Sequence, residues 1–477
     1  MKPQKIVAMI ILTAMAMGVA AGCDSSVTPT ETADTTETSA TEPSEQSQQS
    51  ETTPSSAESS ETEPGATETV PDGFREVDIA YNLTDEDEEV VVFCFDDTFG
   101  DLLSTYSDVA NIRTVVPESG TYRDTLDRVL ASGDEAPDLF LLDASYANDY
   151  FVDDSRTLPV NSLGISYSEL TGMFNYTLQL AESDDNVIKG LTWQATPCAV
   201  FYNRGIAEEL LGVSDPSDIA PMFSDWDTFL STAGTINEAS NGEKKIISGL
   251  DDIWRNYTAS RTGGWITGGR LYMDPVMTGY FDLAKTLTNE GLTFGTTQWD
   301  DNWLNGYNNG TVFSYFIPLW IADLYLNTPA PTDGDPYAGN WGVVRAPSDC
   351  YWGGTWIAAS TYCNSRASAA SIMRDITMDQ TNLEDMARNG IFVNNRFVMG
   401  TISEDASEAR DWLGGQNPAV LLLEVANSID TSLVCDSERQ INEEYMNIVS
   451  SYVAGDIEST EEAREIFESN IAELGII

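Results

Sequence analysis

The chain has 477 residues and no histidine, and its 77 Asp and Glu against 23 Lys and Arg give a formal net charge of −54. This length predicts two or three globular units, and the charge excludes a simple nucleic-acid binder and disfavours electrostatic attachment to anionic lipid. Without histidine, the Ser-His-Asp triad, the Cys-His pair and His-ligated zinc sites are excluded, whereas chemistry that needs only carboxylates remains open.

The N-terminus has the pattern of a secretory signal. Lys2 and Lys5 precede an apolar run, Ile6 to Met17, which is too short to span a bilayer. The run leads to Val19-Ala20-Ala21-Gly22-Cys23, which resembles a bacterial lipoprotein signal, although Ala20 stands where leucine is preferred. The resemblance implies that residues 1–22 are removed and that Cys23 is diacylated. The alternative is an ordinary signal peptide with an incidental cysteine.

The next segment has the composition of a disordered spacer. Asp24 to Asp72 contains 22 Ser or Thr, 12 Asp or Glu, and no basic or aromatic residue. Such a segment cannot bury enough apolar surface to offset the entropy of ordering. We therefore predict a lipid-anchored, disordered tether over residues 23–75, which would hold a folded domain away from the membrane of a Gram-positive bacterium.

The first part of the folded region alternates predicted strands and helices. Apolar, β-branched runs predict buried strands at 90–95, 112–116 and 139–142, and a helical stripe from Tyr122 ends at Gly133. Alternation at this spacing predicts a parallel α/β layer. Ligands of such sheets gather beyond the carboxyl ends of the strands. Asp96, Asp97 and the segment from Asp143 to Tyr146 are therefore candidate binding residues, although Asp96 and Asp97 could instead cap the next helix.

The second part predicts further strands and helices around a stretch rich in Gly, Asn, Asp and Trp. That stretch, about 216–339, suggests a second lobe with long loops. The predicted strands are 199–202, 312–317, 341–344 and 355–359, and the predicted helices are 206–211, 369–376 and one after a capping box at Ser459 and Glu462.

Four segments in register resemble a known family. They are Tyr122 to Leu126 with Ala131-Ser132-Gly133, Ala136-Pro137-Asp138-Leu139-Phe140, Leu191 to Arg204, and Trp341 to Trp356. Together they are similar to the extracellular solute-binding proteins of ABC importers, family 1, which includes maltose-binding protein. The resemblance extends over most of residues 90–377.

The resemblance implies a two-lobe, periplasmic-binding-protein-like α/β fold of type II. Crossing hinge strands would join lobe 1 (86–197 and 348–400) to lobe 2 (198–347 and 401–477), and the lobes would close on ligand. The family's ligand contacts correspond here to Asp96, Asp97, Asp143, Tyr146, Trp193, Gln194, Trp320, Trp352, Gly353 and Gly354.

These residue types suit a sugar. Indole rings offer flat platforms to the C–H faces of a pyranose, and carboxylates and amides bind its hydroxyls. For each tryptophan the alternative is core packing, which we expect for Trp356. Arg261 is a further candidate donor in the cleft, and Gly353-Gly354 could be only a turn.

The cysteines give little indication of chemistry. Without Cys23, five remain, and none form a C-x-x-C motif. Cys94 fits a buried apolar position, and Cys350 and Cys363 could pair or stay free. We expect no metal and no cofactor.

The leading hypothesis is a monomeric, lipid-anchored receptor on the extracellular face of the cell membrane. It would capture a carbohydrate, in particular an oligosaccharide, and deliver it to an ABC permease. The alternatives are a cell-surface glycosidase using a carboxylate pair, a surface adhesin, and a receptor for another solute such as a peptide.

Overall fold

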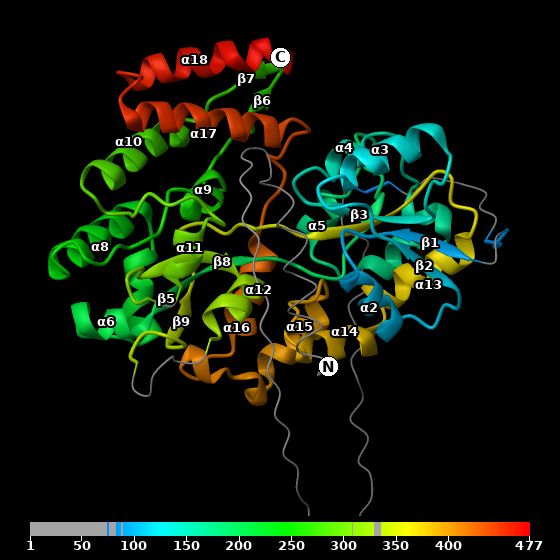
Figure 1. Cartoon of the computed structure of the whole chain (residues 1–477), viewed down its shortest axis with the longest axis horizontal. Helices are drawn as coiled ribbons and strands as arrows, with labels where there is room; N and C mark the ends of the chain where they lie inside the picture. The colour runs from blue at the N-terminus through cyan, green and yellow to red at the C-terminus, as the bar shows by residue number, and fades with distance from the viewer. Residues whose placement is uncertain (1–73, 76–82, 87–88, 308, 329–334) are drawn as a thin grey trace, which may run out of the picture.

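The computed structural model describes residues 74–75, 83–86, 89–307, 309–328 and 335–477. The predicted signal peptide, the predicted lipidation site at Cys23 and nearly all of the predicted tether lie outside the described residues. The described part forms two α/β bodies side by side (Figure 1). We call the body around the five-stranded sheet lobe 1 and the body around the three-stranded sheet lobe 2. The residue ranges predicted for the lobes stay a prediction.

The sheet of lobe 1 has the order β2-β1-β3-β10-β4. Its strands are β1 (Val90–Phe93), β2 (Ile112–Val115), β3 (Leu139–Asp143), β4 (Gly190–Leu191) and β10 (Thr355–Ala359). The strand β1 runs parallel to β2 and β3, which confirms the predicted parallel layer. Strand β10 comes from far along the chain and is antiparallel to both of its neighbours.

Helices pack on this sheet through apolar faces, and two of these faces were predicted from the spacing of apolar residues in the sequence. On α3, Tyr122, Leu126 and Val129 are buried, and the helix ends at Gly133, whose φ of 76° suits glycine. Helix α13 buries Ile372 and Ile376. The helices of this part of the chain are α2 (Thr98–Tyr106), α3 (Tyr122–Ser132), α4 (Asn148–Phe151), α5 (Asn175–Gln179), α13 (Arg366–Thr377), α14 (Gln380–Arg388) and α15 (Arg396–Glu404).

The sheet of lobe 2 is antiparallel and has the order β8-β5-β9. Its strands are β5 (Cys198–Asn203), β8 (Ser314–Pro318) and β9 (Trp341–Val344), and every residue in them is buried. The strands read as continuous apolar runs because they are covered on both faces.

The stretch 216–339, predicted to carry long loops, does contain long connections such as 240–250 and 290–300, but helices fill much of the rest. They are α7 (Pro216–Ile219), α8 (Trp226–Ala239), α9 (Asp251–Thr258), α10 (Pro275–Asn289), α11 (Asp301–Gly306) and α12 (Leu319–Ile321). Several of the polar residues are helix caps rather than loop residues. Asp225 accepts from the backbone N–H of Thr228 at 2.7 Å, and Asp274 accepts from that of Val276 at 2.9 Å, just before Pro275.

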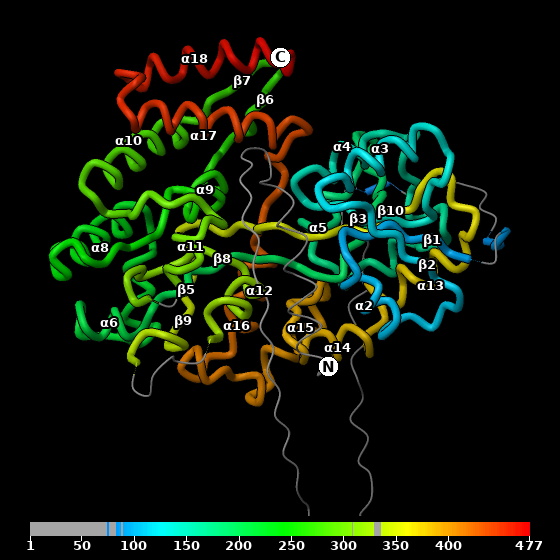
Figure 2. Tube along the Cα trace, viewed as in Figure 1, coloured from blue at the N-terminus to red at the C-terminus, as the bar shows by residue number. Residues whose placement is uncertain are grey.

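Two antiparallel crossing segments join the lobes, as the predicted fold requires (Figure 2). One runs from β4 to β5 and the other from β9 to β10. Trp352 N–H donates to the Thr196 carbonyl at 3.0 Å, and Thr196 Oγ1 donates to the Gly353 carbonyl at 2.9 Å. The hinge is thus a short ribbon of two hydrogen-bonded strands.

Cys350 and Cys363, considered as a pair, are not bonded to each other and have different neighbours. Cys363 lies in lobe 1, where burial, and to a smaller extent the neighbouring Asp138 carboxylate, raises the pKa of its thiol. Cys350 lies in the crossing ribbon and faces Cys198.

A third connection, residues 429–437, passes along the boundary of the lobes from α16 (Pro418–Ser428) to α17 (Glu438–Ala454) (Figure 2). Helix α17 packs on α10 and on the C-terminal helix α18 (Thr460–Glu473). Ser459 caps α18 by accepting from Glu462 N–H at 3.1 Å, but Glu462 accepts from Glu458 N–H, so only half of the predicted capping box forms.

The first described residues dock on lobe 1. Arg75 N–H donates to the Asn186 carbonyl at 2.8 Å, and the guanidinium pairs with Asp185 at 2.9 Å. Tyr167 Oη donates to the Arg75 carbonyl at 3.2 Å. The loop that receives this segment, residues 183–187, follows α5.

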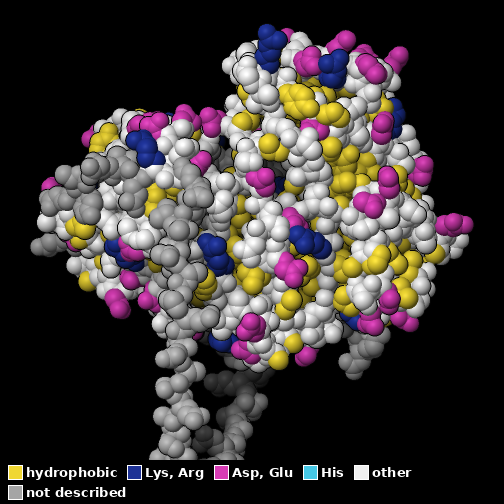
Figure 3. Space-filling view, turned by 180° about the vertical axis from the view of Figure 1, so that it is seen from behind, with side chains coloured by type: hydrophobic (Ala, Val, Ile, Leu, Met, Phe, Trp, Pro, Cys, Tyr) yellow, Lys and Arg dark blue, Asp and Glu magenta, His cyan; other side chains and the backbone are white. Residues whose placement is uncertain are grey.

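Acidic side chains are dispersed over both lobes, with few basic ones among them (Figure 3). Such a surface favours solubility and self-repulsion. Within the described ranges, no helix combines the length and apolar character needed to cross a membrane.

Candidate functional site

A cavity of about 940 Å³ lies between the lobes. Lobe 1 lines it with the segment after β3 and the end of α5, and lobe 2 lines it with α9, Trp299 and the start of α17. The crossing ribbon (349–353) and the third connection (429–436) also line it. A pocket of this size, formed by two lobes and their hinge, is the first place to seek a ligand site.

The segment after β3 brings a carboxylate to this cavity, as its position at a strand end predicted. Asp143 accepts from Ser145 N–H at 2.9 Å and from Ser145 Oγ at 2.5 Å. Removal from water raises the pKa of Asp143, while these hydrogen bonds and the positive charge of Arg255 act in the opposite direction. The carboxylate is therefore fixed in orientation and has lone pairs left for a ligand.

Tyr146 also lines the cavity. The Arg123 guanidinium lies over its ring, 5.0 Å from the centroid, and pairs with Asp149 at 2.5 Å. This cation–π contact with Arg123 helps to hold the phenol ring of Tyr146 in place.

Two tryptophans form an aromatic wall. Trp352 is buried and Trp299 is half-buried, with ring centroids 5.9 Å apart. The Trp299 backbone has a φ of 74°, a strained value for a bulky residue and one that clusters at functional sites. Trp320 does not line this cavity, but it stacks behind Trp299 with centroids 6.2 Å apart and planes 12° apart.

Arg255, which the sequence analysis did not identify, is the central cation. It extends from α9 over the Trp352 ring, 4.3 Å from the centroid, and donates to Gln298 Oε1 at 3.1 Å. Burial lowers the pKa of its guanidinium. Arg255 and Asp143 thus present opposite charges to one cavity from different lobes.

Arg261, the other candidate donor, lines the cavity but is already paired. Its guanidinium meets Glu438 at 2.6 Å, with the two side chains 4% and 15% exposed. It also lies over the Trp265 ring. Its structural role is to attach α17 to the segment after α9.

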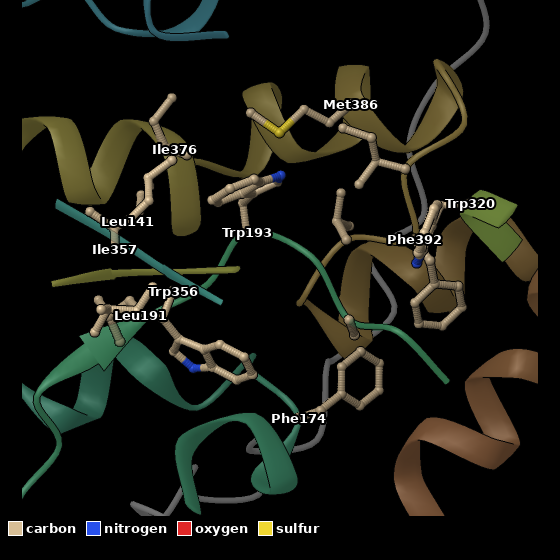
Figure 4. Close-up of a cluster of buried hydrophobic side chains, with 14 of the residues drawn as sticks. Leu141, Phe174, Leu191, Trp193, Trp320, Trp356, Ile357, Ile376, Met386 and Phe392 are labelled. Carbon is tan, nitrogen blue, oxygen red and sulfur yellow. The ribbon is translucent and has the colours of Figure 1, made fainter. Parts of the chain in front are cut away.

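Six predicted site residues lie outside this cavity, and two of them, Trp193 and Asp96, have structural roles in lobe 1. Trp193 is buried among Leu141, Ile376 and Met386 (Figure 4), and its ring lies 5.2 Å from that of Phe99. Asp96 caps the turn that opens α2, accepting from Thr98 N–H at 2.7 Å. The predicted site residues that do not line this cavity are Asp96, Asp97, Trp193, Gln194, Trp320 and Gly354.

The glycines of the crossing ribbon are conformationally required. Gly353 lines the cavity with a φ of 73°, and Gly354 has a φ of 128° while its carbonyl accepts from Ala144 N–H at 3.0 Å. Trp356 is buried as expected, with Nε1 donating to the Thr177 carbonyl at 3.0 Å, although its ring also reaches the cavity wall. Among the described residues, no cluster of three or more Cys, Asp or Glu could hold a metal ion.

No protein-family model matches the sequence, and no curated protein matches it. Solved structures do match. A structure described as extracellular solute-binding protein family 1 aligns with TM-score 0.67 and 16% identity over 82% of this chain and 100% of its own. The galacto-N-biose/lacto-N-biose I-binding protein of an ABC transporter from Bifidobacterium longum, in complex with lacto-N-biose, aligns with TM-score 0.62 and 16% identity over 81% and 97%.

The sugar-binding protein MalE from Xanthomonas citri aligns with TM-score 0.61 and 14% identity over 81% of this chain and 96% of its own. These likenesses establish that the chain has the two-lobe fold of the periplasmic-binding-protein type, as the sequence resemblance implied. The three structures are described as a solute-binding protein, a binding protein of an ABC transporter and a sugar-binding protein.

Proposed function

We propose that this protein is the carbohydrate receptor of an ABC importer. The observation that carries the proposal is the cavity between the lobes, which is lined by the Trp299 and Trp352 indoles, the Asp143 carboxylate and the Arg255 guanidinium. Flat apolar rings beside hydrogen-bonding groups match a pyranose, which has C–H faces and a rim of hydroxyls. Solved proteins of this fold include one in complex with lacto-N-biose, which supports the substrate class.

The mechanism is domain closure without covalent chemistry. A sugar that contacts Asp143 from lobe 1 and Trp299 from lobe 2 at once binds the closed arrangement more tightly than the open one. The difference between the free energies of binding to the closed and to the open arrangement sets how far the ligand shifts the hinge equilibrium. The permease then receives the ligand from the closed receptor.

The cellular setting is also a proposal. A signal peptide over residues 1–22, a lipid on Cys23 and a tether over 23–75 would hold a monomeric receptor on the extracellular face of a Gram-positive membrane. The lobes would comprise residues 86–197 with 348–400 and residues 198–347 with 401–477.

The first experiment is a thermal-melt and tryptophan-fluorescence screen of the purified protein against a panel of oligosaccharides. A rise in melting temperature with one glycan class, together with an unchanged glycan by chromatography, is the expected result. A response only to peptides would keep the fold and overturn the sugar assignment. Turnover of the glycan would establish a glycosidase, and attachment to a cell-wall polymer without small-molecule binding would establish an adhesin.

Variants then test the site with the glycan that responds. Trp352→Ala and Asp143→Asn should each weaken binding at least tenfold, about 1.4 kcal/mol. The matched control is Trp193→Phe, which alters a buried indole outside the cavity and should leave the dissociation constant unchanged. Equal loss in all three variants would mean that the cavity is not the site.

A further inference from the structure

The hinge contains two free cysteines on opposite strands. Cys198 begins β5 on the first crossing, and Cys350 precedes β10 on the second. Cys198 N–H donates to the Cys350 carbonyl at 2.9 Å, and the next pair along the ribbon, Pro197 and Tyr351, forms an antiparallel bridge. The two cysteines therefore stand directly across from each other.

This register meets the geometric requirement for a disulfide. Directly opposed residues of antiparallel strands have Cα atoms about 4.5–5.5 Å apart, and disulfides span Cα separations of about 4.4–6.8 Å. The two thiols also interact with each other, and burial raises the pKa of Cys350. In contrast, Cys363 lies beside Asp138 in lobe 1.

We propose that Cys198 and Cys350 form a disulfide that joins the two hinge crossings. A disulfide of a small thiol or of a thiol oxidoreductase is the oxidant. The thiolate of one cysteine displaces a thiolate from it to give a mixed disulfide, and the second cysteine then displaces the remaining thiol. The two cysteines lose two protons and two electrons, and the oxidant leaves as two thiols.

The position of the pair predicts when the bond forms. The side chain of Cys198 is 1% exposed and that of Cys350 is 5% exposed, so attack on the folded protein is slow. Cys350 lines the ligand cavity, and burial raises the pKa of its thiol although the positive charge of Arg255 acts in the opposite direction. We expect rapid formation during folding in an oxidising medium and slow formation afterwards, through the cavity.

The consequence concerns the hinge and does not depend on which ligand binds. The bond would close a loop over residues 199–349, which includes the sheet of lobe 2, and would limit sliding between the crossing strands. Long closed loops lower the entropy of the unfolded chain, so the oxidised protein should melt higher.

The test is to refold the full chain in a mixture of oxidised and reduced glutathione, alkylate free thiols with N-ethylmaleimide, and map peptides without reduction. A peptide linking Cys198 to Cys350 is expected, and dithiothreitol should lower the melting temperature by roughly 5 °C or more. Alkylation of both cysteines, glutathione adducts alone, or pairing of either with another cysteine would overturn the proposal.

Variants separate the bond from general effects on folding. Cys198→Ser and Cys350→Ser should each abolish the cross-link and make the melting temperature insensitive to dithiothreitol. Cys435→Ser removes another thiol that lines the same cavity, and it should keep both the cross-link and the sensitivity. If either single variant fails to fold, the peptide map of the unmodified chain still decides the question.

Discussion

Asn148 and Asp436 meet beside the cavity, with Asn148 Nδ2 donating to Asp436 Oδ1 at 2.8 Å. Asn148 is the first residue of α4, which follows β3 in lobe 1, and Asp436 lies in the third connection, which leads into α17. Both residues line the cavity, so this hydrogen bond attaches lobe 1 to the third connection beside it. Thr431 Oγ1 makes a second such link to Gln179 Oε1 at 2.7 Å.

The first prediction is that loss of the Asn148 link favours the open arrangement. Asn148→Ala should weaken binding of the glycan about fivefold, which corresponds to the roughly 1 kcal/mol that one hydrogen bond contributes. Asn148→Asp keeps the shape but opposes two carboxylates, so it should weaken binding more, and high salt should reverse that extra loss. Stopped-flow dissociation rates measure both effects. Equal, salt-independent rates for the two variants would contradict the prediction.

The second prediction concerns the strained Trp299. Trp299→Ala and Trp299→Gly should both weaken glycan binding at least tenfold, because each removes the ring from the cavity. Their stabilities should differ, since glycine tolerates a φ of 74° and alanine does not. Calorimetric melting should therefore place the glycine variant above the alanine variant. The reverse order would mean that no strain resides at this residue.

The third prediction compares two ion pairs of α17. Arg261→Ala leaves the Glu438 carboxylate buried without its partner, and we expect a loss of about 3 kcal/mol in the free energy of unfolding. Arg439→Ala breaks an exposed pair with Glu443 on the same helix, and the loss should be below about 1 kcal/mol. Urea titration measures both. Similar losses would show that burial does not decide the strength of these pairs.

The fourth prediction follows from the buried Asp252. Burial raises the pKa of its carboxyl from 3.8 to about 6, even though Trp303 Nε1 and two backbone N–H groups donate to it. The folded state thus binds the proton more tightly than the unfolded state. Asp252 therefore adds most to the free energy of unfolding below pH 4. This contribution, about 3 kcal/mol, is lost as the pH rises through about 6.

Asp252→Asn removes this proton-binding group and should flatten the fall in stability between pH 4 and 6. The variant will be less stable overall, because the amide cannot accept all three hydrogen bonds. Asp225→Asn is the control of opposite sign. Hydrogen bonds from Thr228 lower the pKa of Asp225, so this group stabilises the protein above its unfolded pKa, and that stability is lost as the pH falls. Urea titrations that extend from pH 6 to below pH 4 measure both effects, since the contribution of Asp225 is lost only below its unfolded pKa of 3.8. An unchanged slope for Asp252→Asn between pH 4 and 6 would contradict the prediction.

The fifth prediction tests the anchor. Cys23→Ser should release the protein from the membrane fraction into the medium, because a serine at this position cannot receive the thioether-linked lipid. Immunoblots of fractionated cells measure the distribution. Retention of the variant in membranes would mean that another attachment exists.

Much of the fold was predictable because its signals are local. The buried β-branched run at Val90 and the glycine stop at Gly133 determine their elements through burial and backbone freedom alone. Helix α9 was not predictable from hydrophobic spacing, since its buried face includes the polar residues Asp252 and Asn256. Their side chains also bind partners 51 and 92 residues away in the chain, Trp303 and Ser348, and these distant contacts leave no local pattern.

The candidate site divides in the same way. Asp143 and Trp352 were identifiable because they sit at a strand end and on a predicted crossing. Arg255 and Trp299 belong to the stretch that lacked a recognisable pattern, and only the folded chain brings them to the cavity. Trp193 has the same chemistry as Trp352, but tertiary packing turns its ring into the core of lobe 1.

The docking of Arg75 has a mechanical consequence. Arg75 is bound to residues 185 and 186, and Asn186 lines the cavity. A chain anchored upstream of Arg75 therefore pulls on lobe 1 at the rim of the cavity, and no described contact of Arg75 passes that load to lobe 2. If the chain is anchored upstream of Arg75 as proposed, lobe 1 carries the load and lobe 2 is the lobe that moves on closure.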